Sequence, residues 1–258
     1  MKPLLECQDV CYSYHSFAGE TPALKNINFT LQEGDFLSIV GPSGCGKSTL
    51  LSLICGLIAP ESGNILYEGN PITATVHQNI GYMLQRDHLF EWRTIRRNVL
   101  LGLEIQKKVQ PDTLAYAEHL LTVYGLSSFA DKKPSELSGG MRQRAALIRT
   151  LVLKPDLLLL DEPFSALDYQ TRLQVADDIG QIIKAEKKTA ILVTHDLAEA
   201  ISMGDQVLVL SSRPGSVRSL VPISLCAQLT PMEKRNCEDF KTYFNLIWKE
   251  LETNEFTK

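Results

Sequence analysis

The chain has 258 residues, a formal net charge of −4 and 44% hydrophobic residues, which is the composition of an ordinary globular protein. These values exclude collagen-like, fibrous and disordered chains, and the slight acidic excess argues against a nucleic-acid-binding protein. The longest nearly apolar stretch, residues 50–59, is shorter than the about 20 residues that a membrane-spanning helix needs. Residues 1–6 lack the long apolar region of a secretory signal, so we expect a cytoplasmic protein.

The six cysteines contain no Cys-x-x-Cys pair, the spacing that is typical of zinc and redox sites. Several lie inside apolar runs, as Cys55 does within residues 53–57. We therefore expect buried, reduced thiols rather than metal ligands or disulfide bridges. The positions concerned are Cys7, Cys11, Cys45, Cys55, Cys226 and Cys237.

The first third of the sequence is typical of short strands separated by turns. Residues 36–40 form a mostly apolar strand, which suits a sheet that is covered on both faces. A segment of helical length and apolar content follows at residues 48–58, and Pro60 closes it. The other strands expected here are residues 4–14, 27–31, 63–67 and 80–84.

The middle of the sequence is helical in pattern and contains no convincing strand. Its expected helices are residues 98–108, 113–124 and 140–151. The strand pattern then resumes with residues 157–160, 190–194 and 206–210, and the expected helices 169–186 and 197–202 follow the first two of these strands. This order predicts an α/β fold with a mostly parallel core sheet.

These patterns predict a single domain over residues 1–258. Its core comprises residues 1–85 and residues 151–225. A helical subdomain, residues 86–150, is inserted between the two parts of the core. A short helical tail, residues 226–258, contains an amphipathic helix over residues 232–252 with one apolar face, formed by Phe240, Phe244, Ile247 and Leu251.

Residues 41–48, Gly-Pro-Ser-Gly-Cys-Gly-Lys-Ser, match the phosphate-binding pattern G-x-x-x-x-G-K-[ST]. The glycines let backbone N–H groups turn inward around phosphate oxygens. Lys47 supplies positive charge to the β- and γ-phosphates, and the Ser48 hydroxyl can ligate magnesium. The alternative of a structural glycine turn is disfavoured by the apolar strand before the loop and the helix after it. The predicted nucleotide site contains Gly41, Pro42, Ser43, Gly44, Cys45, Gly46, Lys47, Ser48 and Thr49.

Residues 157–162 form an apolar strand that ends in two carboxylates, Asp161 and Glu162. Ligands bind at the carboxyl ends of parallel strands, and adjacent strand residues point to opposite sides, so we expect separate roles for the two. Asp161 suits the binding of magnesium, directly or through water. Glu162 suits the orientation and deprotonation of an attacking water. The alternative, a solvated acidic turn, is disfavoured beside the Lys47 loop.

Residues 137–144, Leu-Ser-Gly-Gly-Met-Arg-Gln-Arg, place Ser138, Gly139 and Gly140 at the start of a helix, which forms a second anion-binding helix N-terminus. Taken alone, this segment would be an ordinary helix cap. With the loop and the acidic pair, it resembles the Leu-Ser-Gly-Gly-Gln signature of ATP-binding cassette (ABC) ATPases, with Met141 in place of the usual Gln. The resemblance covers residues 4–222 and implies a P-loop NTPase fold with an N-terminal antiparallel β subdomain. It also implies a protein that binds and hydrolyses ATP with Mg²⁺.

The same resemblance implies roles for residues outside these motifs. Tyr14 is similar to the aromatic residue that stacks on adenine, and Gln85 to the glutamine that contacts magnesium and water. Residues 165–168 resemble the loop that communicates across a cassette dimer, so we expect Asp168 at the nucleotide site. His195 resembles the switch histidine that contacts the γ-phosphate. The implied catalytic residues are Lys47, Gln85, Glu162 and His195, and the implied metal ligands are Ser48, Gln85 and Asp161.

Residues 89–95, Leu-Phe-Glu-Trp-Arg-Thr-Ile, indicate a subgroup. They resemble the Leu-Leu-Pro-Trp-Arg-Thr run of cassettes from nitrate, sulfonate and taurine importers, with Glu91 in place of the proline. Residues 211–215 resemble the same group, and related cassettes serve the uptake of pyrimidine precursors and riboflavin. Phe90 and Trp92 are candidate walls of the groove that receives a permease, with Arg93, Arg96 and Arg97 at its rim. The alternative is that Trp92 lies in the core and that the arginines form a solvated face.

The resemblance therefore implies the energy subunit of an importer, bound peripherally to the cytoplasmic face of the cell membrane. Its expected partners are a second ABC ATPase subunit in a homodimer, integral membrane permease subunits and an extracytoplasmic solute-binding protein, with no nucleic acid. Two alternatives stay open. One is a cassette of an export or lipoprotein-release complex, and the other is a soluble ABC ATPase switch.

Overall fold

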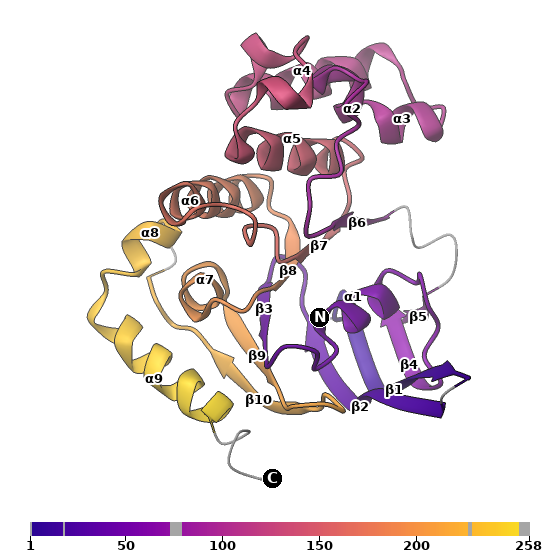
Figure 1. Cartoon of the computed structure of the whole chain (residues 1–258), viewed down its shortest axis with the longest axis vertical. Helices are drawn as coiled ribbons and strands as arrows, with labels where there is room; N and C mark the ends of the chain where they lie inside the picture. The colour runs from indigo at the N-terminus through magenta and orange to yellow at the C-terminus, as the bar shows by residue number, and fades with distance from the viewer. Residues whose placement is uncertain (1, 18, 73–78, 227–228, 253–258) are drawn as a thin grey trace.

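A computed structural model describes residues 2–17, 19–72, 79–226 and 229–252, and its strands form two sheets (Figure 1). The larger, six-stranded sheet has the order β10-β9-β3-β8-β7-β6. Its neighbouring strands run parallel except for β10, which is antiparallel to β9. The strands are β3 (Phe36–Val40), β6 (Ile80–Met83), β7 (Leu157–Asp161), β8 (Thr189–Val193), β9 (Gln206–Leu210) and β10 (Val217–Pro222).

The smaller sheet is antiparallel and comes from the amino-terminal part of the chain, in the order β2-β1-β4-β5. It confirms the expected antiparallel β subdomain. The second strand is longer than predicted, because it pairs with β1 along most of its length, from Gly19 opposite Ser16 to Leu31 opposite Leu5. The strands are β1 (Leu5–Ser16), β2 (Gly19–Leu31), β4 (Ser62–Tyr67) and β5 (Asn70–Pro71).

The central strands β3, β7 and β8 are buried along their whole length, because their two faces pack into two different cores. In β7, Leu157 and Leu159 join the core shared with the antiparallel sheet and α1 (Lys47–Ile54). Leu158 and Leu160 join the opposite core, which α5 (Gly139–Leu151) and α6 (Tyr169–Ala185) cover. This alternation explains why the strands are mostly apolar on both faces, as expected for a parallel sheet covered on both sides.

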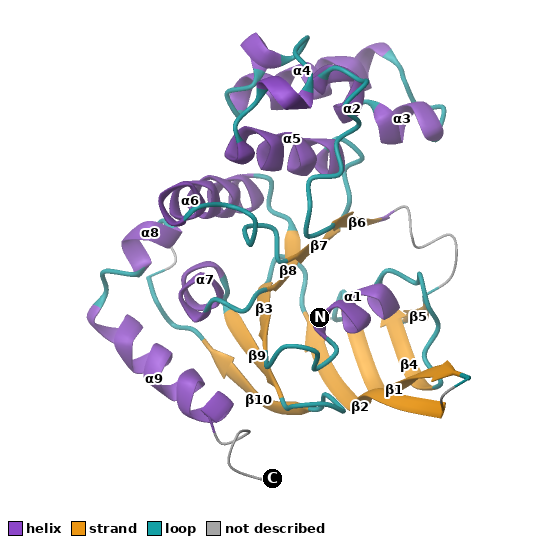
Figure 2. Cartoon of the chain, viewed as in Figure 1, coloured by secondary structure: helices purple, strands orange, loops and turns teal. Residues whose placement is uncertain are grey.

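The helices of the middle of the chain gather beyond the β6 and β7 end of the sheet, as Figures 1 and 2 show. No named strand lies between β6 and β7 in the part of the chain that the structure describes. The predicted helix 98–108 is in fact two helices, which separate at Leu100. The elements here are α2 (Ile95–Val99), α3 (Leu101–Ile105), α4 (Pro111–Val123), two short 3-10 helices (Ser127–Phe129 and Pro134–Glu136) and α5.

Two predicted helix boundaries are wrong for local reasons. Helix α1 ends at Ile54 rather than at residue 58, because Gly56 adopts a left-handed conformation, with φ +70°, that terminates it. The predicted helix 232–252 is split into α8 (Pro231–Lys234) and α9 (Glu238–Glu252). The split lets α8 pack against α6 while α9 packs against α7 (Leu197–Met203) and strands β9 and β10.

The expected apolar face of the last helix is confirmed. Ile247 is fully buried, and Phe240, Phe244 and Leu251 pack beside it on a third core, under α7 and β9. The predicted tail also includes residues 227–228 and 253–258, which lie outside the described residues. Every helix within the described ranges is too short or too polar to cross a bilayer.

All six cysteines are free thiols, as predicted, but their burial differs. Cys7, Cys45 and Cys55 are buried as expected, and burial raises the pKa of each thiol. Cys226 is exposed, so the expectation of burial is wrong for it. The reason is its position between β10 and α8, outside both sheets.

Candidate functional site

The phosphate-binding loop turns from β3 into α1 through two glycines with positive φ, Gly44 at +75° and Gly46 at +102°. A side chain at Gly46 would also collide with Leu24, whose Cδ2 lies 2.7 Å from the position of a Cβ. The loop therefore requires glycine both for its backbone conformation and for its close contact with β2.

Lys47 is the first residue of α1, and its side chain folds back over the loop. Its ammonium donates hydrogen bonds to the backbone carbonyls of Gly41, at 2.8 Å, and Pro42, at 3.0 Å. The residue is only 7% exposed. This places a largely buried cation beside backbone N–H groups at the start of a helix, which is the donor set that phosphate oxygens require.

A cleft of about 520 Å³ lies over this loop. Tyr14 borders it, and the Tyr14 hydroxyl lies 3.0 Å from the Thr49 Oγ1. The volume lies within the range of about 300–1,000 Å³ that is usual for small-ligand sites. The remaining lining residues are Ala23, Ser43, Gly44, Gly46, Lys47, Ser48, Glu162, His195 and Arg213.

Asp161, the last residue of β7, faces the loop. The Ser48 hydroxyl donates to its Oδ1 at 3.1 Å, and the Tyr82 hydroxyl donates to its Oδ2 at 3.2 Å. Burial raises the pKa of Asp161, while these two hydrogen bonds oppose the rise. A serine hydroxyl beside a buried carboxylate is an all-oxygen ligand pair, which fits a hard cation such as Mg²⁺.

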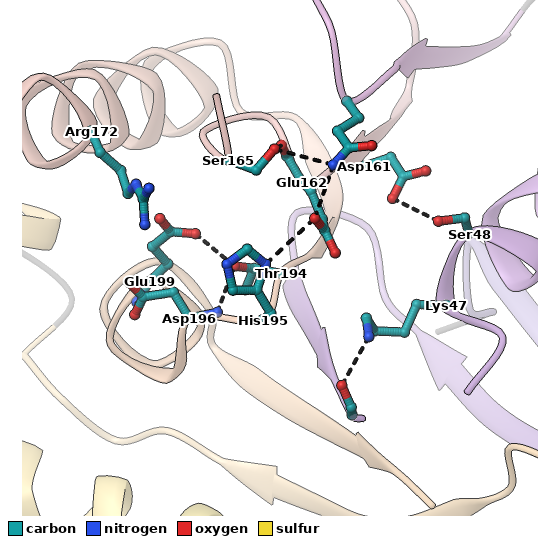
Figure 3. Close-up of polar contacts among 12 residues, drawn as sticks. Lys47, Ser48, Asp161, Glu162, Ser165, Arg172, Thr194, His195, Asp196 and Glu199 are labelled. Atoms are coloured by element: carbon teal, nitrogen blue, oxygen red, sulfur yellow. Dashed lines mark hydrogen bonds and ion pairs between the residues drawn. The ribbon is translucent and has the colours of Figure 1, made fainter. Parts of the chain in front are cut away.

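Glu162 lies at the point where the strand ends, in a left-handed conformation with φ +44° that a non-glycine residue adopts only at a cost of about 1–2 kcal/mol. Its Oε2 accepts a hydrogen bond from the Gln85 amide at 3.2 Å and lies 3.4 Å from Nδ1 of His195 (Figure 3). The Gln85 amide also donates to Ser165 Oγ at 3.3 Å. Gln85, after β6, and His195, after β8, thus both lie against the carboxylate of Glu162 at the end of β7.

The other predicted nucleotide-binding residues lie away from this cleft. Ser138 caps α5 by accepting a hydrogen bond from the Met141 N–H, and Gly139 borders a second cleft of about 480 Å³. Gly140 is buried in the first turn of the same helix. Asp168 caps α6, and the Thr171 hydrogen bonds hold the pKa of that carboxyl below its usual value. Within one chain, none of the four lines the cleft above Lys47.

The structure adds residues that sequence patterns did not predict for the site. Arg213 and Ala23 border the cleft, and Arg213 Nε donates to the carbonyl of Pro22 at 3.1 Å. Gly215 makes two hydrogen bonds to β2 that flank Leu24: its N–H donates to Ala23 O and its carbonyl accepts from the Lys25 N–H, each at 2.9 Å. Sequence patterns give the segment 211–215 only a subgroup resemblance, because its contacts are with residues almost 200 positions earlier.

Trp92 settles one of the alternatives left open by the sequence. It is 73% exposed, so it is not a core residue, and its ring stacks on that of half-buried Phe90 at 4.7 Å between centroids. Arg93 is tied to Glu104 by an ion pair of 2.6 Å. These two aromatic residues follow the Gln85 segment directly and form an exposed apolar patch.

The fold and the cleft together define a nucleotide-binding protein of the phosphate-loop ATPase class. The ABC transporter family pattern matches residues 24–165, which is more than half of the chain. The chain therefore belongs to the ABC transporter family of ATP-binding proteins, and it is an ATP hydrolase of the ABC type.

Three relatives illustrate this membership. The Bacillus subtilis protein described as the uncharacterized ABC transporter ATP-binding protein YtlC is 49% identical over 97% of this chain and 96% of its own length. The nitrate import ATP-binding protein NrtD of Synechocystis is 41% identical over 86% of this chain and 83% of its own. The taurine import ATP-binding protein TauB of Pelagibacter ubique is 43% identical over 77% and 75%, respectively.

A solved structure agrees with the fold. The ATP-binding cassette MJ0796, in a dimeric post-hydrolysis state bound to ADP and Pi, superposes with a TM-score of 0.72. It is 30% identical and covers 85% of this chain and 98% of its own. The likeness confirms the predicted α/β cassette architecture.

Proposed function

We propose that this chain is the energy subunit of an ABC importer and that it couples ATP hydrolysis to the uptake of a small solute. The observation that carries the proposal is that three groups lie around one cleft: Lys47, the hydrogen-bonded pair of Ser48 and Asp161, and the pair of Glu162 and His195. The likeness to nitrate and taurine import subunits supports the importer class. The proposed organisation is the predicted one, a single cassette of residues 1–258 with a helical part at 86–150.

The cleft residues have separate roles in this proposal. Lys47 and the backbone of residues 41–49 hold the phosphates, and Tyr14 stacks on the adenine. Glu162 accepts a proton from the attacking water, and Gln85 and His195 orient that water and the γ-phosphate beside it. Because one hydrogen bond from Gln85 and the contact with His195 converge on Glu162 Oε2, both neighbours constrain the position of this base.

Mg²⁺ would be held by Ser48, Asp161 and Gln85, and it would neutralise charge on the β- and γ-phosphates. The oxygen-rich pair of Ser48 and Asp161 fits this cation. Asp161 is ready to act as a ligand only when ionised, and the hydrogen bonds from Ser48 and Tyr82 favour that form against the effect of burial.

The position of the second glycine segment supports a head-to-tail dimer. Ser138, Gly139 and Gly140 form an anion-binding helix N-terminus that lies away from the cleft of their own chain. In the proposal they contact the nucleotide held by a second copy, and Asp168 faces the same interface. ATP then joins the two copies, and its hydrolysis releases them.

The partners follow from this role. We propose that the patch of Phe90 and Trp92 receives a permease subunit at the cytoplasmic face of the membrane, and that a solute-binding protein delivers the solute outside. The solute would resemble nitrate, a sulfonate such as taurine, or a vitamin precursor. A cassette of an export or lipoprotein-release complex, or a soluble ATPase switch, would share the catalytic residues.

The test is to extract the tagged full-length chain from membranes in mild detergent and identify its partners by mass spectrometry. We expect a multi-span permease and an exported binding protein, whose ligand screen then names the solute. A permease without a binding protein would point to export or lipoprotein release. Recovery of soluble partners only would overturn the transporter role.

A further inference from the structure

Two buried polar side chains lie directly behind His195. Thr194 is 2% exposed and Glu199 is 4% exposed, and the Thr194 hydroxyl donates to Glu199 Oε2 at 2.6 Å. The same hydroxyl accepts a hydrogen bond from the N–H of Asp196 at 3.0 Å. The Thr194 hydroxyl therefore bonds to the backbone of Asp196, on the other side of His195, and links residues 194–196 to helix α7 through Glu199 (Figure 3).

The acceptor in this arrangement is itself held firmly. The N–H groups of Ala198 and Glu199 donate to Oδ1 of Asp196, which caps α7. Thr194 donates its own N–H to Ile39 in strand β3. The residues on both sides of His195 are thus fixed to the core sheet and to α7.

The charge of Glu199 has partners on other elements. Burial and Asp196 raise the pKa of Glu199, whereas the Thr194 hydrogen bond, Arg172 of α6 and Arg235 after α8 oppose the rise. Figure 3 shows Arg172 and Glu199 pointing toward one another. Arg172 also donates to the carbonyl of Leu167, next to Asp168, at 3.0 Å. Arg172 therefore lies between the Glu199 carboxylate and the loop before Asp168, which the proposed dimer places at its interface.

We propose that Thr194 and Glu199 are positioning residues for ATP hydrolysis, which hold the backbone of residues 194–196 so that the His195 ring stays against Glu162. The inference rests on the proposed role of His195. Packing alone does not explain the pair, because an apolar pair would fill the same space without burying a carboxylate. The His195 side chain is exposed, and its Nδ1 lies 3.4 Å from Glu162 Oε2, so its own packing does little to orient it.

The test compares ATP turnover by purified full-length variants. Thr194→Val is nearly isosteric and removes the hydroxyl, and Glu199→Ala removes the acceptor. Because a misplacement of about 1 Å at a reacting centre costs about a hundredfold in rate, we expect kcat to fall by about 10- to 100-fold with KM for ATP within about twofold. Thr194→Ser and Glu199→Gln keep the hydrogen bond and should retain most of the turnover.

A matched control is Ser202→Ala, which removes another buried hydroxyl bond, one made to the backbone carbonyl of Glu199, and leaves the bond from Thr194 to the Glu199 carboxylate in place. We expect this variant to lose thermal stability while keeping kcat. In a His195→Ala background, adding Thr194→Val should cause no further fall in residual turnover, because the positioning effect acts through the ring.

The outcomes separate the two claims. Wild-type turnover in His195→Ala would refute the proposed role of His195 itself. A loss in His195→Ala with unchanged kcat in Thr194→Val would overturn the positioning inference alone. An equal fall in kcat for Ser202→Ala, or an additive fall in the His195→Ala background, would show that the pair only supports folding and would also overturn the inference.

Discussion

Gly215 lies against the phosphate-binding loop so closely that alanine has no room there. A Cβ at this position would lie 2.1 Å from the backbone oxygen of Cys45, whereas real Cβ contacts are essentially never below 3.0 Å. The two groups must separate by at least 0.9 Å, the difference between 3.0 and 2.1 Å. Gly215 is pinned to β2 by two hydrogen bonds of 2.9 Å, so much of this shift falls on the loop.

We therefore expect Gly215→Ala to weaken ATP binding. Losing one charge-assisted hydrogen bond to phosphate through such a displacement costs about 1.5–3 kcal/mol, which is about a tenfold to hundredfold rise in the Kd for ATP. Overpacking costs about 1–3 kcal/mol of folding free energy. Isothermal titration of the monomer with ATP measures the first effect, and thermal unfolding without nucleotide measures the second.

Gly34→Ala is the matched control. Gly34 has φ +86° but nothing within 4 Å of its Cβ position, and it does not border the ATP cleft. This variant should lose about 1–2 kcal/mol of stability through backbone strain and keep its ATP affinity. If Gly215→Ala binds ATP as tightly as the wild type does, the contact with Cys45 does not set the shape of the loop and the reasoning is refuted.

Three further predictions concern the cleft and the proposed dimer. Burial raises the pKa of Asp161, so the folded state binds more protons than the unfolded state between the two pKa values, and wild-type stability falls as pH rises through that window. Asp161→Asn should therefore raise the melting temperature at pH 7 and abolish Mg²⁺-dependent turnover. A lower melting temperature would contradict this prediction. Tyr14→Ala should weaken ATP binding by about 1–3 kcal/mol in titration while Tyr14→Phe does not, and equal losses would instead implicate the hydrogen bond with Thr49. Ser138→Arg should abolish turnover and leave monomer ATP affinity unchanged, whereas a large loss of monomer affinity would argue against a site shared across the dimer.

The sheet and its order of helices could be predicted from the sequence, because strands that are buried on both faces are apolar along most of their length. Strand β7 is a continuous run of leucine up to Asp161, and a run of that kind fits a covered parallel strand. Helix ends were harder to predict, because they depend on single conformations. The left-handed Gly56 ends α1 before its apolar pattern ends.

The residues of the site also differ in how far the sequence predicts them. The phosphate-binding loop could be predicted because its chemistry lies in eight consecutive residues. The roles of Gln85 and His195 came only from family resemblance, since each meets Glu162 through a different strand end. The Thr194 and Glu199 pair and the position of Arg213 could not be predicted, because they depend on how α7 and the segment after β9 pack.

The proposed role of Glu162 as the base of ATP hydrolysis is tested most directly by Glu162→Gln. The substitution keeps the shape of the side chain and removes its ability to accept a proton, and general bases contribute about 10²–10⁴-fold to rate. We predict that this variant binds ATP with wild-type affinity, loses at least about a hundredfold in turnover, and accumulates as an ATP-bound dimer in size-exclusion chromatography. Hydrolysis at the wild-type rate would remove Glu162 from the role of base and contradict the account.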